Sequence, residues 1–446
     1  MRLWAFFEFY RKNVTVSICL DGHDFSQLDK AFLLAKGSSD KPTVLIADTV
    51  MGKGISFMED DANNGSSKWH HAKLTEQQYQ QSRSELATVM SGQVKEQFQK
   101  VHPIEQELPV LSMKDFEAIR HKVSNSDLPD DANKALMSYL MELAEVDNRI
   151  IYLISDLTGS GAVQSKEFRV RFPDRYFDLG IREQTMIAVA GGLADSGKRP
   201  VALSYDAFVG LMAEQYRILT LDKLPVILWG ICSGASSAQG DRTHQSNAQP
   251  SIYAYEAGNY FEPGRPEETF DVLVGAMTSN KPSYIRTSRL SVQQTPLISP
   301  TLHSDGAYIL KETSGTPDII LVTLGSVFQN ALNLTPKLEE QGIQYRIIHI
   351  NQLNESKLQE HLKPLLIEGV PILTIHDAQK RILGNIVSGI ITSKPATKHD
   401  LYSAGNTDYG PLNGEGDSNF TMRAIGIDPE SLFQQVVWII SDSFNP

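Results

Sequence analysis

Short apolar runs alternate with helix-like stretches along the chain from residue 130 onward. The apolar runs cover residues 150–155, 201–205, 225–230, 318–325, 345–350 and 371–375. Strands that alternate with helices are typical of parallel sheets, because the helical crossovers cover both faces of the sheet. The sequence therefore predicts an α/β fold with two doubly wound domains, at residues 130–295 and 305–446.

The first region, residues 1–75, carries a smaller version of this pattern. Strand-like runs at 14–18 and 43–47 flank a helix-like stretch at 25–35. One strand–helix–strand unit cannot cover both faces of its own strands. This region is therefore predicted to be a fragment of a larger sheet, and residues 76–129 are predicted to be a linker.

The charge and cysteine content argue against several classes of protein. The 53 acidic residues outnumber the 41 Lys and Arg residues, which gives a formal net charge of −12. This balance argues against a general binder of nucleic acids or of anionic membranes. Cys19 and Cys232 lie far apart, and no apolar run is long enough to span a membrane. We expect a cytoplasmic protein without a disulfide framework.

Glu183 stands at a strand–helix junction where a buried carboxylate can take part in proton transfer. It follows a strand-like run at 176–179 and opens an apolar helix pattern rich in small residues at 186–194. A carboxyl group buried at such a junction has a raised proton affinity and can share a proton with a heterocycle. The alternative is a glutamate that only favours the positive end of the helix dipole.

The run at 178–184, Asp-Leu-Gly-Ile-Arg-Glu-Gln, resembles the Gly-Ile-x-Glu-Gln signature of thiamine-diphosphate enzymes of the transketolase type. Residues 21–24, 49–54 and 68–74 resemble, in the family's order, the end of its pyrophosphate-binding domain. The two larger predicted domains resemble its pyrimidine-binding and C-terminal domains. The resemblance thus covers nearly the whole chain.

The resemblance implies a thiamine diphosphate cofactor and assigns residues to it. Glu183 would contact a ring nitrogen of the aminopyrimidine, so that its imino tautomer can deprotonate the thiazolium carbon. Phe208 resembles the family's stacking aromatic and Tyr205 lies beside it, while Asp156 and Leu157 are assigned as further cofactor contacts. For two aromatics three residues apart, ordinary core packing is the alternative.

The same resemblance assigns four residues to the substrate. His244 lies in a Thr-His-Gln run and His70 in a Trp-His-His run, and both resemble active-site histidines that move protons or bind donor hydroxyls. Arg289, at the end of a Tyr-Ile-Arg-Thr-Ser-Arg run, and Ser160 would bind a sugar phosphate. A surface ion pair for Arg289 and a plain turn for Ser160 are the alternatives.

Three positions depart from the family pattern in ways that bear on the substrate. Asp241 and Arg242 stand in a Gly-Asp-Arg run where the family has Asp-Gly-Pro before Thr-His-Gln. The moved carboxylate puts the choice of acceptor in doubt, and Arg242 adds a cation that can bind phosphate. Asn133 stands where the family usually has a second phosphate-binding arginine, and an amide is a weaker phosphate partner.

His376 and Asp377 follow the last strand-like run of the third region. The ends of strands in such sheets border clefts, which makes the pair a possible functional site. A turn at a domain interface is the interpretation that we favour.

The family's phosphate-holding Gly-Asp-Gly motif, with its downstream Asn, has no counterpart in these 446 residues. The nearest string, at 414–419, has Ser418 in place of the second Gly and is interpreted as a loop. No metal ligand is therefore expected in this chain. Ligands for the diphosphate and for Mg²⁺ (or Ca²⁺) are expected on a second subunit, in a two-plus-two assembly like the family's dimers.

The implied reaction is transfer of a two-carbon ketol unit from a ketose phosphate to an aldose phosphate. Deoxyxylulose-phosphate synthases and the β chains of 2-oxoacid dehydrogenases share the architecture and remain an alternative. A truncated chain without catalytic activity is a further alternative, because half of the expected cofactor site is missing.

Overall fold

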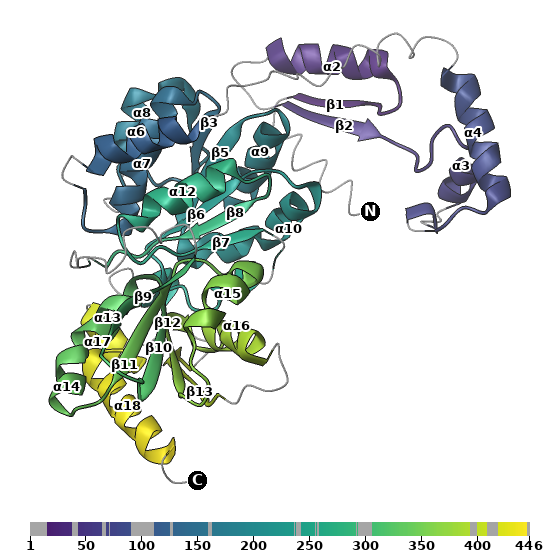
Figure 1. Ribbon diagram of the computed structural model, residues 1–446. Helices are drawn as coiled ribbons and strands as arrows, with labels where there is room; N and C mark the ends of the chain where they lie inside the picture. Colours follow the sequence, from purple (N-terminus) through teal and green to yellow (C-terminus); the bar gives the residue numbers. More distant parts are fainter. Residues whose placement is uncertain are drawn as a thin grey trace. The chain divides into compact units, whose positions relative to one another are not determined.

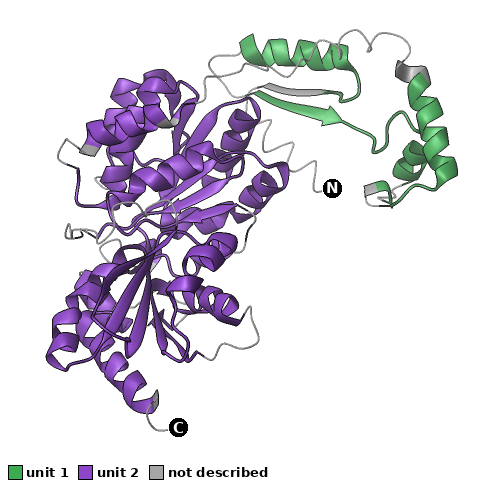
Figure 2. Ribbon diagram, viewed as in Figure 1, with its two compact units in different colours: residues 1–105 green, residues 106–446 purple. Residues whose placement is uncertain are grey.

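The computed structural model describes residues 16–37, 43–64, 68–70, 72–90, 111–124, 128–158, 163–235, 237, 242–254, 256, 258–290, 292, 306–392, 399–407 and 418–443. The chain divides into two compact units, residues 1–105 and residues 106–446 (Figure 1 and Figure 2).

The first unit is built on a parallel pair of strands. Its elements are β1 (Val16–Asp21), α2 (Phe25–Gly37), β2 (Thr43–Asp48), α3 (Ser56–Asn63), the 3₁₀ turn η1 (Lys68–His70) and α4 (Glu76–Met90). β1 and β2 pair in parallel with α2 as their crossover, which confirms the predicted strand–helix–strand unit. Phe32, Leu33 and Leu34 of α2 stay 61%, 62% and 66% exposed, because two strands offer little surface to cover them.

The second unit contains a six-stranded sheet in the order β4-β3-β5-β6-β8-β7, with every pair parallel. The strands are β3 (Ile150–Ile154), β4 (Tyr176–Asp178), β5 (Arg199–Tyr205), β6 (Ile227–Ile231), β7 (Asn259–Phe261) and β8 (Ser283–Arg286). The connecting helices are α7 (Ala132–Val146), α8 (Ser165–Arg171), α9 (Glu183–Asp195), α10 (Ala213–Asp222), α11 (Gln249–Ala254) and α12 (Glu268–Thr278). The 3₁₀ turns are η2 (Pro173–Arg175), η3 (Asp206–Met212) and η5 (Arg242–His244).

Helices cover both faces of this sheet, as the alternation predicts. Alternate residues of a strand point to opposite faces. Tyr152 of β3 accordingly packs in the cluster that contains α7 and α12, whereas Leu153 packs in the cluster that contains α9. Helix α6 (Met113–Ser124), from the stretch predicted as a linker, also packs in the cluster with α7.

A second sheet follows in the order β13-β12-β10-β11-β9. Its strands are β9 (Ala307–Glu312), β10 (Ile319–Leu324), β11 (Tyr345–Ile350), β12 (Ile372–Gln379) and β13 (Leu401–Asn406). Its helices are α13 (Phe328–Asn333), α14 (Thr335–Glu340), α15 (Glu355–His361), α16 (Arg381–Thr392), α17 (Ser418–Ala424) and α18 (Pro429–Ser443), with 3₁₀ turns η6 (Gly325–Val327) and η7 (Lys363–Leu365). The predicted α/β fold is thus confirmed. The antiparallel edge strand β9 was not predicted.

The two sheets belong to one compact unit and share a core. One apolar cluster runs from α9 and β5 of the first sheet to β10 and α16 of the second. Backbone hydrogen bonds also join them, since the N–H of Glu262 donates to the carbonyl of Asn351 at 2.8 Å. In the described part of the chain, no helix is both long enough and apolar enough to cross a membrane.

Candidate functional site

The carboxyl end of the first sheet gathers three of the predicted site residues. Tyr205 ends β5, Phe208 lies in η3 directly after it, and His244 ends η5. The His244 ring centroid lies 5.3 Å from that of Tyr205 and 5.2 Å from that of Phe208, and both contacts are edge-on. The Tyr205 and Phe208 centroids are 6.3 Å apart. These three side chains are called the ring cluster below. Their predicted cofactor and substrate roles remain predictions.

Glu183 lies next to β5, the strand that ends at Tyr205. It is the first residue of α9 and is only 7% exposed. Ser204, which precedes Tyr205 in β5, donates a hydrogen bond from Oγ to Glu183 Oε1 at 3.5 Å. The predicted carboxylate is therefore buried beside β5 and at the start of a helix. Both the chemical and the dipole interpretation of Glu183 fit this position.

Asp178 organises the turn that leads to Glu183, a role that was not predicted. Its Oδ1 accepts the N–H groups of Asp156 at 2.9 Å and of Gly180 at 3.0 Å, and its Oδ2 accepts the Thr158 hydroxyl at 2.9 Å. These bonds hold the carboxyl end of β3 against that of β4. Asp156 itself is exposed in a left-handed conformation with φ of 57°, and Leu157 is half-buried.

Four predicted site residues fall, wholly or by their side chains, outside the described residues. Ser160 and Asp241 lie outside the described residues, as do the side chains of His70 and Arg242. Their assignments remain predictions from the resemblance.

Arg289 and Asn133 differ in how they can meet a ligand. Arg289 is exposed shortly after β8. Asn133 is fully buried; its Nδ2 donates to the carbonyl of Ser288 at 2.9 Å, and its Oδ1 accepts the Thr287 hydroxyl at 2.6 Å. The buried amide of Asn133 therefore holds the segment that leads to Arg289. Its amide fits this role because it donates and accepts at once.

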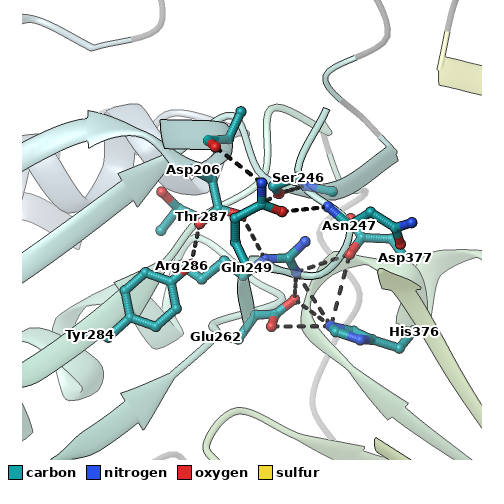
Figure 3. A network of polar contacts seen from close by, with 12 residues as sticks. Asp206, Ser246, Asn247, Gln249, Glu262, Tyr284, Arg286, Thr287, His376 and Asp377 are labelled. Carbon is teal, nitrogen blue, oxygen red and sulfur yellow. Dashed lines mark hydrogen bonds and ion pairs between the residues drawn. The ribbon is translucent and has the colours of Figure 1, made fainter. Parts of the chain in front are cut away.

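A buried ionic cluster, which the sequence did not predict, lies between the two sheets (Figure 3). At its centre, Arg286 donates from Nε to Asp206 Oδ2 at 2.9 Å and from Nη1 to Asp377 Oδ1 at 2.9 Å. Nη1 also donates to Glu262, whose two carboxylate oxygens each lie 3.2 Å from His376 Nε2. We call Arg286, Asp206, Glu262, His376 and Asp377 the Arg286 cluster.

His376 and Asp377 therefore lie at a contact between the two sheets, as the favoured interpretation proposed. The prediction of a turn was wrong, because both residues belong to strand β12. Glu262, His376 and Asp377 are spaced closely enough to hold a metal ion. Arg286 Nη1 lies 3.3 Å from His376 Nε2 and donates hydrogen bonds to both carboxylates. The guanidinium of Arg286 therefore occupies the place that a metal ion would take.

Glycines make room for the three carboxylates of this cluster. A Cβ at Gly230 would collide with Asp206, one at Gly234 with Asp377 and one at Gly325 with Glu262. Any side chain at these positions would push a buried carboxylate away from Arg286. The glycines are thus part of how the sequence specifies the cluster.

The charges of the cluster shift the pKa values of its members in different directions. Burial raises the pKa of Asp206, although Arg286, Ser246 and Tyr284 oppose the shift. Burial also disfavours ionised Glu262, yet Arg286 and His376 outweigh it and lower the pKa of Glu262 to about 2. Burial lowers the pKa of Arg286, but the three carboxylates outweigh it and raise that pKa well above its ordinary value.

Two parts of the chain match known families. Residues 131–294 match the transketolase pyrimidine-binding domain, and residues 306–405 match the transketolase-like C-terminal domain. Together they cover more than half of the chain. Over these two domains, the chain belongs to the transketolase family. The resemblance that starts from the Glu183 run is thereby confirmed.

One curated relative matches about two thirds of this transketolase-family chain. The 1-deoxy-D-xylulose-5-phosphate synthase of Clostridium kluyveri is 29% identical over 318 residues, which are 69% of this chain and 48% of the synthase. This chain therefore spans about half the length of that relative.

Solved structures confirm the fold. A transketolase mutant from Pichia stipitis matches with a TM-score of 0.66 and 19% identity, over 96% of this chain and 67% of that chain. A split-gene transketolase, solved as an inactive β4 tetramer, matches with a TM-score of 0.56 and 23% identity, over 70% of this chain and 98% of that chain. At these identities the likeness concerns the fold alone.

In this transketolase-family chain, Glu262 should stabilise the fold in a pH-dependent way. Its pKa falls from an ordinary value of 4.5 to about 2 on folding, so its contribution is full above the ordinary pKa and is lost as the pH falls toward 2. The difference in unfolding free energy between wild type and Glu262→Gln should shrink by on the order of 2 kcal/mol between about pH 6 and about pH 3. Urea unfolding at several pH values measures it. A difference that stays constant with pH would contradict the assignment of the shift to Glu262.

Proposed function

We propose that this chain is one subunit of a thiamine-diphosphate-dependent, transketolase-type transferase. It moves a two-carbon ketol unit from a ketose phosphate to an aldose phosphate. The observation that carries the proposal is the meeting of Tyr205, Phe208 and His244 at the carboxyl edge of a sheet, beside the buried carboxylate of Glu183. This is the edge where open α/β sheets bind ligands, and it lies in the stretch that matches a pyrimidine-binding domain.

The residues at this edge fit the aminopyrimidine of thiamine diphosphate. When bound, the cofactor supplies a thiazolium carbon that becomes a nucleophile once it loses its proton. Glu183 holds a proton at a pyrimidine ring nitrogen, where burial strengthens the hydrogen bond. Phe208 and Tyr205 offer aromatic surface to the ring. Asp156 and Leu157, at the neighbouring end of β3, complete the cofactor contacts.

Other residues of the chain act on the sugar. His244, which contacts both aromatic rings, binds a donor hydroxyl and moves a proton. His70 is assigned the same kind of role. Arg289, Ser160, Asp241 and Arg242 bind the phosphate and hydroxyl groups of the substrates.

The diphosphate and its Mg²⁺ (or Ca²⁺) are held by a second polypeptide in this proposal. Two observations support it. The 446 residues contain no Gly-Asp-Gly motif, and the structure of a split-gene transketolase chain is matched over 98% of its length. A partner that continues the β1–β2 sheet would also cover apolar side chains such as Phe32 and Leu34. The expected assembly holds two copies of each chain.

A second candidate is a deoxyxylulose-phosphate synthase-like reaction, which the 29% identity to such a synthase favours. That chemistry uses a 2-oxoacid donor and releases carbon dioxide, whereas ketol transfer from a ketose releases none. Assays of the assembled enzyme with an aldose phosphate acceptor and either a ketose phosphate or a 2-oxoacid as donor, each followed for product and carbon dioxide, separate the two. Turnover of the ketose phosphate donor, without turnover of the 2-oxoacid, supports the proposal. Carbon dioxide release from the 2-oxoacid favours the second candidate, and no turnover of either would favour an inactive chain.

Arg289→Ala should weaken the binding of phosphorylated sugars by about 2–4 kcal/mol, because a guanidinium binds phosphate through charge-assisted hydrogen bonds. Sugars without phosphate should bind as they do to wild type. KM values for matched phosphorylated and free sugars measure the effect, and Arg217→Ala, an exposed arginine paired with Glu214 on α10, is the control. Equal losses for both kinds of sugar would show that Arg289 supports the structure instead.

A further inference from the structure

We propose that Asp206 and Arg286 are positioning residues through which the C-terminal domain fixes the ring cluster. The catalytic meaning of this arrangement rests on the proposed function, whereas its geometry rests on contacts within the second unit. The path runs from β12 through Arg286 to Asp206, and from Asp206 to the segments that carry Tyr205, Phe208 and His244.

Asp206 stands between two members of the ring cluster along the chain. Its carboxylate is fully buried and accepts hydrogen bonds from the hydroxyls of Tyr284 and Ser246 and from Arg286 Nε (Figure 3). A carboxylate held by three donors has a fixed orientation. The backbone between Tyr205 and Phe208 is therefore fixed with it.

The loop that carries His244 is tied to the same carboxylate. Ser246, two residues after His244, donates to Asp206 and accepts the N–H of Gly234 at 2.7 Å. Gln249 adds a second link, because its Nε2 donates to the carbonyl of Ala207 at 3.0 Å and its Oε1 accepts the N–H of Asn247 at 2.8 Å. The aromatic rings and His244 are thus set relative to each other by bonds around Asp206.

Arg286 extends this arrangement into the second sheet. Its Nη1 donates to Asp377 Oδ1 at 2.9 Å and to Glu262, and it lies 3.3 Å from His376 Nε2. The N–H of Gln379, also in β12, donates to the carbonyl of Asn247 at 3.1 Å. Removing one partner of a buried ion pair leaves an uncompensated charge that must move or find another partner. Loss of the Asp377 charge should therefore displace Arg286, and with it Asp206.

The histidine ring of His244 reports this coupling directly. In the full chain with ¹³C-labelled histidine, ring signals are recorded by NMR, and the His244 signal is assigned by its loss in His244→Gln. Because two aromatic rings contact His244 edge-on, a small displacement changes the ring-current shift of its signal. We expect Asp206→Asn and the remote Asp377→Asn both to move this signal. Ser246→Ala, which removes only one hydroxyl, is the milder variant should Asp206→Asn not fold.

Glu268→Gln is the matched control. Glu268 is also fully buried between the two sheets, where it accepts hydrogen bonds from Tyr308 at 2.8 Å and Gly264 at 2.7 Å and pairs with His349 at 3.2 Å. It makes a comparable contact between the domains without touching Asp206 or Arg286. We expect Glu268→Gln to lower the melting temperature but to leave the His244 signal in place. A His244 signal that Asp377→Asn leaves unmoved, or that Glu268→Gln moves equally, would overturn the inference.

A second readout in the assembled enzyme connects the coupling to function. There, Asp206→Asn and Asp377→Asn should weaken thiamine diphosphate binding by up to about tenfold. This is the loss expected when displaced aromatic rings give up roughly one contact with the cofactor. If the assembled enzyme binds no thiamine diphosphate but the His244 signal moves as expected, the proposed function fails and the positioning role stands. If binding and transfer are normal in Asp377→Asn and the signal is unmoved, the positioning role alone fails.

Discussion

Replacing Glu183 with glutamine is expected to slow exchange of the thiazolium proton by about two to four orders of magnitude. Glutamine keeps the shape of the side chain but cannot share a proton with the pyrimidine in the same way. Glu183 is 7% exposed at the start of α9, and its carboxylate accepts a hydrogen bond from Ser204 of β5. Proton exchange followed by NMR in the assembled enzyme, with thiamine diphosphate bound, measures the effect.

The control separates this chemistry from a helix-dipole effect. Glu167 lies in the first turn of α8 and is exposed, so it has the same relation to a helix N-terminus without the buried setting. Glu167→Gln should change stability by about 0.3–1 kcal/mol and leave exchange untouched. Near-normal exchange in Glu183→Gln would remove Glu183 from cofactor activation and leave the dipole interpretation.

Local patterns were enough to predict the fold because buried parallel strands leave continuous apolar runs. The runs at 318–325 and 345–350 correspond closely to β10 and β11. The edge strand β9 was missed because it has only six residues, and its mixed apolar and polar pattern is a weaker signal than a continuous apolar run. Its antiparallel pairing with β11 depends on tertiary contacts that no local pattern encodes.

The ring cluster was predictable only from the family resemblance, because Tyr205 and His244 lie 39 positions apart by their numbers and meet through the sheet. The Arg286 cluster as a whole was not predicted, although His376 and Asp377 were expected at a domain interface. Arg286 is 80 residues from Asp206 and 91 from Asp377, and isolated charged residues usually indicate a solvated surface. Gly230, Gly234 and Gly325 carried the missing signal, since each marks a place where a carboxylate packs against backbone.

We propose that this chain completes its cofactor site only with a second polypeptide. The diphosphate of thiamine diphosphate and the Mg²⁺ bound to it both need ligands from protein. The 446 residues contain no Gly-Asp-Gly motif that would hold them. The chain alone should therefore be inactive and bind thiamine diphosphate poorly, and it should be dimeric through residues 130–295 and 305–446 or prone to aggregate. A polypeptide that carries Gly-Asp-Gly and its downstream Asn should restore binding.

Titration calorimetry of thiamine diphosphate, with and without Mg²⁺, tests whether the site needs a second polypeptide. It is run on the chain alone, on the partner alone and on the mixture, and ketol transfer is assayed on the same samples. We expect tight, Mg²⁺-dependent binding and transfer only in the mixture. Full cofactor binding and transfer by this chain alone, with its mass confirmed to correspond to these 446 residues, would contradict it.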